Sequence, residues 1–278
     1  MCDLTKMLRD LVIVRAGKDS LHRFWTLHHS EREWDVKVCP YEDLGNQDGC
    51  PTIPGQKWTG LSQLLAAWDD WQAYRYVWLP DDDIFAIPQQ IDSFFRRCRE
   101  LAAKIAAPAL SEESFYTWPI TMRNRSYVAR ETTYIENMAP CFRVDILREV
   151  LPTFSLTKSG FGWGLSYLWV KHVGYQGVFI VDDTPMLHTR PVGQTRDKRV
   201  VSVAISEMRH LLAEHGATPI QKTLRGYAAF NRVLDSSSDQ FIVDYIAGYQ
   251  YLVAKRPAVL AHLMAQQAVP LPGRTSLG

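Results

Sequence analysis

Three consecutive aspartates, Asp81 to Asp83, are the residues in this chain with the clearest chemical consequence. They follow residues 74–80, an apolar and aromatic stretch that is typical of a β-strand. Carboxylates that lie side by side repel one another unless a cation or a positively charged ligand compensates them. Mg²⁺ and Mn²⁺ prefer oxygen ligands and bridge to phosphate oxygens. The run therefore indicates a metal–diphosphate site at the end of a strand or, alternatively, an acidic surface turn that caps the next helix.

The segments around the aspartates alternate between strand and helix patterns. Residues 11–14 and 36–39 have strand composition, and residues 61–71 repeat large apolar side chains at helical spacing. A further helix is expected to begin at Pro88, because proline is favoured at the first helical position. This alternation predicts an α/β fold, with a sheet flanked by helices.

The pattern changes beyond about residue 195. Before that point, residues 133–142 and 177–181 are expected to form strands, and residues 144–151 a short helix. After it, we expect no strand and three helices, at residues 201–212, 241–253 and 258–267. The sequence thus predicts a ligand-binding domain over residues 1–195 and a helical C-terminal appendage over residues 196–278.

Composition excludes several classes of protein. The 278 residues are 46% hydrophobic and 22% charged, and the net charge of +1 creates no field that would favour nucleic acid. Five cysteines without CxxC spacing indicate neither a zinc site nor a disulfide framework. Residues 1–10 do not resemble a signal peptide, and no long apolar stretch could span a membrane. We expect a cytoplasmic protein, either free or peripheral at the inner face of the membrane.

Basic residues near two strand ends are candidates for binding a nucleotide. Arg15, Ala16 and Lys18 lie in the loop after the first expected strand, a position suited to nucleotide contact. Lys18 and Arg190 could pair with phosphate oxygens, or they could be solvated surface charges. The loop carries no GxGxxG or Walker pattern.

Residues 160–164, Gly-Phe-Gly-Trp-Gly, form an aromatic loop whose glycines permit unusual backbone angles. Trp163 could form the wall of a sugar site, because the C–H faces of sugars pack on aromatic rings. Alternatively, the loop is a tight turn in which Trp163 fills the core.

The ordered segments together resemble the GT-A glycosyltransferases, whose acidic strand end is called the DxD motif, and more specifically the DUF707 family. The resemblance spans residues 11–195 and leaves the C-terminal part uncovered. The matching segments are residues 57–58, 78–84, 108–110, 118–121, 135–140, 162–165 and 181–182, followed by His188.

This resemblance implies a GT-A-like, Rossmann-like mixed sheet and a nucleotide-sugar donor, with a UDP-sugar favoured. Mn²⁺ or Mg²⁺ would hold the donor's diphosphate and neutralise the charge on the leaving group. The implied metal ligands are Asp81, Asp83 and His188. Asp82 would join Arg15, Ala16, Lys18 and Arg190 at the nucleotide, and Trp118, Trp163, Gly164 and Ser166 would contact the sugar or acceptor.

Ser166 departs from the pattern of the family, which has an aspartate as general base at this position. A serine cannot act as that base near neutral pH. Another carboxylate, namely Glu136, Asp182 or Asp183, could supply the base. Otherwise the enzyme is retaining and needs no such base, or it is catalytically weak.

The leading hypothesis is a metal-dependent glycosyltransferase that acts on a glycan or lipid-linked acceptor. One alternative is a nucleotidyltransferase that acts on sugar phosphates, although the loop after residue 14 has few of the glycines and basic residues such enzymes need. Another is a non-catalytic carbohydrate-binding protein of the same fold. The C-terminal helices could serve as an acceptor-side lid, a homodimer contact or a membrane-surface patch.

Overall fold

The computed structural model describes residues 9–27, 31–45, 50–192, 198–230 and 232–271. In this part of the chain the fold is α/β, as the sequence predicted, with ten strands and eight α-helices. The strands are β1 (Asp10–Ala16), β2 (Trp34–Pro40), β3 (Tyr76–Trp78), β4 (Ile84–Phe85), β5 (Ile105–Leu110), β6 (Ala129–Thr132), β7 (Cys141–Arg143), β8 (Val178–His188), β9 (Thr223–Tyr227) and β10 (Val233–Asp235).

The helices are α1 (Lys57–Ala67), α2 (Pro88–Glu100), α3 (Val144–Val150), α4 (Leu165–His172), α5 (Lys198–Glu214), α6 (Asp239–Gly248), α7 (Gln250–Lys255) and α8 (Ala258–Ala268). Pro88 occupies the first turn of α2, as expected. No α-helix among the described residues is both long and apolar enough to cross a membrane.

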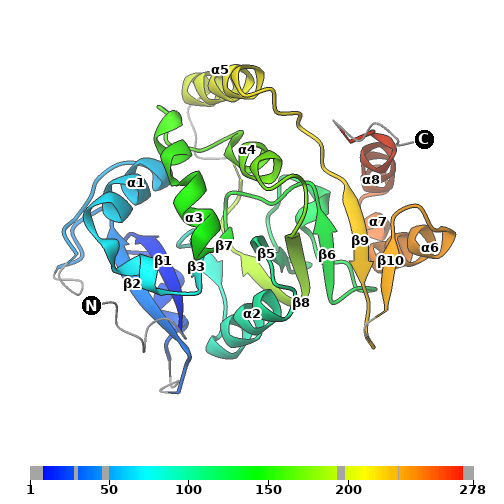
Figure 1. The fold of residues 1–278 in the computed structure, drawn as a ribbon, viewed down its shortest axis with the longest axis horizontal. Coiled ribbons are helices and arrows are strands. Elements are labelled where there is room, and N and C mark those ends of the chain that lie inside the picture. Colours follow the sequence, from blue (N-terminus) through cyan, green and yellow to red (C-terminus); the bar gives the residue numbers. More distant parts are fainter. Residues whose placement is uncertain (1–8, 28–30, 46–49, 193–197, 231, 272–278) are drawn as a thin grey trace.

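A mixed sheet lies between two layers of helices (Figure 1). Its strand order is β10-β9-β6-β8-β5-β7-β3-β1-β2, and β4 pairs with the end of β8. Successive residues of a strand point to opposite faces. Leu11 and Ile13 of β1 accordingly belong to one apolar cluster, which extends to residues of α1, α3 and α4, whereas Val12 and Val14 belong to a second cluster, which extends to residues of α2 and α6 to α8. The sheet therefore lies between two apolar cores, one on each face.

Strand direction brings several strand ends to one edge of the sheet. β1 runs parallel to β2 and β3, and β5 runs parallel to β8. β7 is antiparallel to both β3 and β5, so these two groups of strands point the same way. The carboxyl ends of β1, β3, β5 and β8 consequently share an edge, which is where ligands bind in open α/β sheets.

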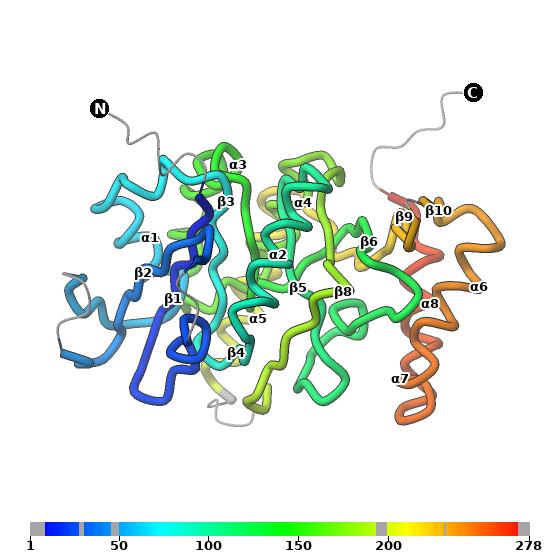
Figure 2. Tube along the Cα trace, turned by 90° about the horizontal axis from the view of Figure 1, so that it is seen from below, coloured from blue at the N-terminus to red at the C-terminus, as the bar shows by residue number. Residues whose placement is uncertain are grey.

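The C-terminal part contains more than the expected helices. All three helical stripes are present, the second divided between α6 and α7. However, β9 and β10 also extend the main sheet, with β9 pairing antiparallel to β6, so the expectation of no strand here was wrong. β1, β2 and α1 lie at one end of the molecule, and β9, β10 and α6 to α8 at the other (Figure 1 and Figure 2).

Two strand boundaries differ from the sequence prediction. Of the strand expected at residues 133–142, residues 133–140 instead form a loop between β6 and β7, and only the last two residues belong to β7. This loop faces the site described below. The strand expected at residues 177–181 continues to His188 as β8. It continues because its last two residues pair with β4 and because Thr184, Met186 and His188 are buried at alternate positions.

Candidate functional site

A cavity of about 910 Å³ opens at the carboxyl edge of the sheet. Its lining comes from the segment after β3, the N-terminal ends of α1 and α4, the loop after β6, the end of β8 and one face of α5. This size falls within the range of small-molecule binding sites. All three aspartates of the run line the cavity.

Asp81 pairs with a lysine from α1. Lys57 Nζ lies 2.7 Å from Asp81 Oδ1 and also donates hydrogen bonds to the carbonyl oxygens of Asn137 and Met138. Burial lowers the pKa of Lys57 and raises that of Asp81, while their attraction opposes both shifts. The Asp81 side chain is 39% exposed, and since it lines the cavity that exposure is toward the cavity interior.

Asp82 ties three segments together. Its Oδ2 accepts hydrogen bonds from the Gly17 amide and the Tyr41 hydroxyl, each at 3.0 Å. Its Oδ1 lies 3.3 Å from Arg190 NH1. Burial and the charge of Asp82 raise the pKa of Tyr41 to about 12, so this hydroxyl remains a donor. Asp82 therefore links the segments that follow β1, β2 and β8 at the edge of the cavity.

Asp83 faces His188. His188 Nε2 lies 3.4 Å from Asp83 Oδ2, and His188 Nδ1 lies 2.7 Å from the Phe115 carbonyl oxygen. Because a carbonyl oxygen can only accept, Nδ1 carries a proton and Nε2 is directed toward Asp83. Burial would lower the pKa of His188 and raise that of Asp83. Their mutual interaction outweighs burial and shifts both pKa values in the opposite direction.

Each aspartate of the run thus has a different basic partner: Lys57, Arg190 or His188. Protein groups supply the charge compensation that the sequence suggested a metal would provide. One acceptor remains, because Asp83 Oδ1 is buried and has no hydrogen-bond partner in the described part of the chain. A buried carboxylate oxygen without a donor is costly and indicates a missing partner.

The residues fit a divalent cation that takes two ligands from the protein. Asp83 offers a buried oxygen that has no donor, and His188 in its neutral form offers Nε2. Asp81 does not converge with them, and the described residues contain no group of three or more His, Cys, Asp and Glu side chains arranged to hold a metal. Mg²⁺-type sites commonly use one or two carboxylates and complete their shell with phosphate oxygens and water.

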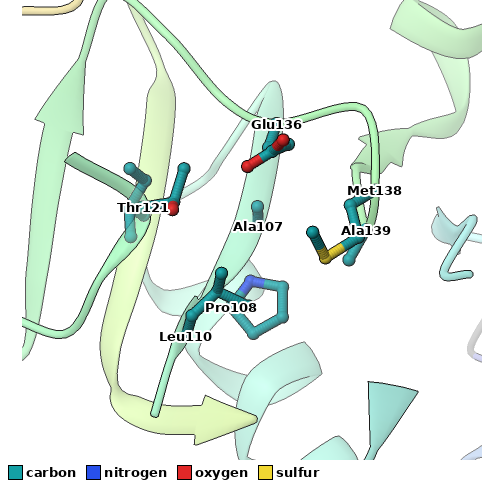
Figure 3. Close-up of a pocket in the computed structure, with 8 residues that line it drawn as sticks. Ala107, Pro108, Leu110, Thr121, Glu136, Met138 and Ala139 are labelled. Carbon is teal, nitrogen blue, oxygen red and sulfur yellow. The ribbon is translucent and has the colours of Figure 1, made fainter. Parts of the chain in front are cut away.

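The three candidate bases lie in very different places. Glu136 lines the large cavity and also a small pocket beside β5. Figure 3 shows its carboxylate near Ala107, between Thr121 and Met138. Burial and the charge of Glu136 raise the pKa of the neighbouring Tyr134 well above its usual value.

Asp182 and Asp183 are not among the described residues that line the cavity. Asp182 is fully buried, and both of its oxygens accept hydrogen bonds from Arg130, at 2.8 and 2.9 Å. The Asn124 amide donates a further bond of 2.7 Å to it. Asp183 pairs with Arg97 of α2. These positions do not support the base role suggested for either residue, because their carboxylates already bind protein donors away from the cavity.

Some of the residues predicted to bind the nucleotide line the cavity and others do not. Arg190 lines the cavity, with its NH2 group 2.9 Å from the Asp19 carbonyl oxygen. Arg15 lines it too, but its guanidinium donates to the carbonyl oxygens of Ile53 and Gly55 and so holds that loop. Ala16 is buried in β1, and Lys18 is exposed with its amide bonded to Glu42, so neither is placed against the cavity.

The expected sugar-binding residues all line the cavity: Trp118, Trp163, Gly164 and Ser166. The rings of Phe161 and Trp163 stack with centroids 5.8 Å apart. Gly162, at φ +71°, lies so close to Trp58 that a Cβ would overlap the indole ring. The loop therefore needs glycine here, and its two rings belong to the cavity wall rather than to the core.

Sequence reasoning missed two parts of the site. Lys57 was only a matching position in the resemblance, and nothing local indicated its pairing with an aspartate 24 positions later. The cavity-facing residues of α5, namely Val201, Ile205, Met208 and Arg209, were assigned only to a helix. The apolar stripe at positions 201, 205 and 208 was visible in the sequence, but its cavity-facing role was not.

A scan against protein-family models found no match, and a search of curated proteins found no similar sequence. Among solved structures, S. aureus TarS residues 1–349 in complex with UDP-GlcNAc is 11% identical at a TM-score of 0.46, covering 92% of this chain and 84% of that one. A mycobacterial protein is 13% identical at 0.46, with coverages of 78% and 79%. The 4-diphosphocytidyl-2C-methyl-D-erythritol synthase of Anaerococcus prevotii is 11% identical at 0.42, with coverages of 73% and 98%.

Proposed function

We propose that the chain is a glycosyltransferase that uses a nucleotide-sugar donor, a UDP-sugar in the first instance, together with Mn²⁺ or Mg²⁺. The main support is the charge arrangement at residues 81–83. Three carboxylates, each with its own basic partner, border a cavity of about 910 Å³. Of the three, Asp83 is the one that has a buried oxygen without a hydrogen-bond donor. This arrangement suits a cation with a diphosphate better than it suits an acidic surface turn.

In this proposal Asp83 and His188 hold the cation, which when bound neutralises charge on the departing diphosphate. The Phe115 carbonyl keeps His188 in the tautomer that directs Nε2 inward. Lys57 cancels the charge of Asp81, so that the site does not repel phosphate. The Arg190 side chain is 43% exposed, and in this proposal it attracts a phosphate oxygen while it keeps its contacts with Asp82 and the Asp19 carbonyl oxygen.

Glu136 is the carboxylate that we propose accepts the proton of the acceptor hydroxyl. Of the three carboxylates considered from the sequence, it alone borders the cavity in the described chain. Glu136→Gln should lower turnover by about 10²–10⁴-fold, the usual effect of removing a general base. Donor binding should be unchanged, because Glu136 does not take part in the Asp83–His188 pair.

A nucleotidyltransferase is less well supported. Enzymes of that class bind a triphosphate through free amides in the loop after the first strand. Here the Gly17 and Lys18 amides donate to the carboxylates of Asp82 and Glu42. A triphosphate would have to displace both carboxylates.

The test is isothermal titration with UDP, GDP and CMP, each with and without Mn²⁺. We expect one of the nucleotides to bind with an affinity that Mn²⁺ raises at least about tenfold, and Asp83→Asn to remove that increase. The matched control is Asp145→Asn, because Asp145 forms a surface ion pair with Arg143 and lies outside the cavity lining. If none of the nucleotides binds with Mn²⁺ present, the proposal is wrong.

A further inference from the structure

One wall of the cavity is an apolar face of α5. Val201, Ile205 and Met208 line the cavity and follow one another at spacings of four and three residues, which places them on one side of the helix. All three are half-buried. Val192, which is 39% exposed, also lines the cavity. These aliphatic side chains offer a bound molecule no hydrogen-bonding group.

This wall is firmly built into the protein. Ala204, Leu211 and Leu212 of α5 are buried against the rest of the molecule. Glu207 accepts hydrogen bonds from the amides of Lys158 and Ser159 and from the Ser159 hydroxyl. α5 is thus fastened to the segment that leads into the Phe161–Trp163 loop.

The join between α5 and the aromatic loop is close. A Cβ added at Gly164 would lie 3.2 Å from Met208 Cγ, which is tighter than an ordinary contact, so Met208 packs directly against the backbone of this loop. The aromatic loop and the aliphatic face therefore form a continuous surface. Apart from Arg209 of α5, the charged groups that line the cavity lie on other elements, chiefly the segment after β3 and the end of β8.

We propose that the acceptor is an amphipathic molecule whose apolar segment lies along α5 while its hydroxyl group reaches Glu136. This inference rests on the proposed function and chooses between its two acceptor classes. The apolar segment could be an alkyl or prenyl chain, or an aryl group, since all share the chemistry that this face recognises. Arg209 also lines the cavity, but it is exposed to solvent.

Energetics disfavour a purely glycan acceptor on this surface. A second sugar ring against Val201, Ile205 and Met208 would bury hydroxyl groups without partners, and each such group would weaken binding by about 5- to 150-fold. A methylene group in the same place gains about 0.8 kcal/mol. The difference between the two acceptor classes is therefore large enough to measure.

The experiment compares ligands that share a sugar and differ in what is attached to it. Methyl, butyl, hexyl and octyl β-D-glucoside, phenyl β-D-glucoside and cellobiose are titrated calorimetrically below micellar concentrations. We expect affinity to rise roughly two- to fourfold for each added methylene group. Octyl glucoside should bind more tightly than cellobiose, and phenyl glucoside reports whether an aryl group is accepted as well.

Ile205→Gln should reduce the gain per methylene group. Val203→Gln is the matched control, because Val203 is 59% exposed on the same helix and is absent from the cavity lining. Affinity that is flat with chain length, tighter binding of cellobiose than of octyl glucoside, or equal losses in the two variants would each overturn the inference.

UDP and Mn²⁺ are titrated into the same preparations to separate the two proposals. If glucoside affinity rises with chain length but no nucleotide binds, the cavity has an apolar subsite and the proposed glycosyltransferase function is wrong. Nucleotide binding without chain-length dependence would keep the glycosyltransferase and reject the amphipathic acceptor.

Discussion

Two acidic segments in this chain look alike in sequence and differ completely in their surroundings. Asp81 to Asp83 and the pair Asp182-Asp183 both follow apolar, strand-like residues. Asp182 is saturated by Arg130 and the Asn124 amide, with both ionic side chains fully buried. Asp83 has one basic partner at 3.4 Å and one oxygen without any in the described residues. What distinguishes a structural carboxylate from a binding carboxylate here is an oxygen without a donor on a residue that lines the cavity.

The largest expected effect tests the structural side of this comparison. Arg130→Met should lower the free energy of unfolding by about 3–5 kcal/mol, because it leaves the buried Asp182 charge without its partner. Arg130 also donates to the carbonyl oxygens of Ile120 and Met122 and to the Tyr249 hydroxyl, which would lose a donor. Urea denaturation measures the change. A loss below about 1 kcal/mol would contradict a structural role for this pair.

Removing the binding carboxylate, Asp83, should have the opposite effect: a large loss of binding and a small loss of stability. Asp83→Asn should weaken Mn²⁺-dependent nucleotide binding by roughly 10–100-fold, because it removes a charged ligand. Its effect on the free energy of unfolding should stay within about 1 kcal/mol, since the open oxygen already lacks a partner. Calorimetry and urea denaturation on the same variant give both values. A large stability loss with unchanged binding would show that Asp83 resembles Asp182.

Lys57→Met sharpens the comparison within the acidic run itself. Removing the ammonium group frees the Asp81 carboxylate, which is 39% exposed to the cavity. We expect affinity for Mn²⁺ without nucleotide to rise roughly three- to tenfold, because the site gains a carboxylate. Lys57→Arg, which keeps the charge, is the control. Weaker Mn²⁺ binding by Lys57→Met would mean that Lys57 is needed to hold the loop at Asn137 and Met138 in place.

The smallest effect concerns Asp10, a buried carboxylate at the opposite edge of the sheet. It pairs with Arg75 and Arg99, yet its Oδ1 lacks a partner in the described chain. Burial raises its pKa to about 6 despite both arginines. Since the folded pKa lies above the unfolded one, ionised Asp10 disfavours folding above about pH 6, and this penalty shrinks as the pH falls toward 4.

Between pH 7 and pH 5, Asp10 should therefore add about 1 kcal/mol to the free energy of unfolding. Asp10→Asn should lack this contribution, so subtracting its pH profile from that of the wild type isolates the effect. A difference that falls rather than rises with decreasing pH would show that the two arginines, not burial, dominate at Asp10.

The parts of the fold with local signals could be predicted from the sequence. β1, β2 and α2 carry their own composition, periodicity or proline signal and lie where expected. β9 could not be predicted, because it gains its stability from pairing with β6, about 95 residues earlier in the chain. The same limit applies to side chains: the ion pair of Asp182 with Arg130 joins residues 52 positions apart.

The candidate site shows the same division. Strand-end chemistry indicated Asp83, and the resemblance to GT-A glycosyltransferases implied His188. The cavity brings both together with Glu136 and Trp163. The sequence did not reveal that Lys57 and Arg190 already compensate the negative charges of Asp81 and Asp82. The cation therefore has only Asp83 and His188 left to bind in our proposal, which makes its position sharply testable.

Manganese anomalous diffraction from crystals grown with UDP and Mn²⁺ tests the central claim most directly. We predict a single peak about 2.1 Å from Asp83 Oδ1, with His188 Nε2 and diphosphate oxygens completing the shell. Lys57 should still contact Asp81. A bound diphosphate without a manganese peak at Asp83, or a peak at Asp182 instead, would contradict the account.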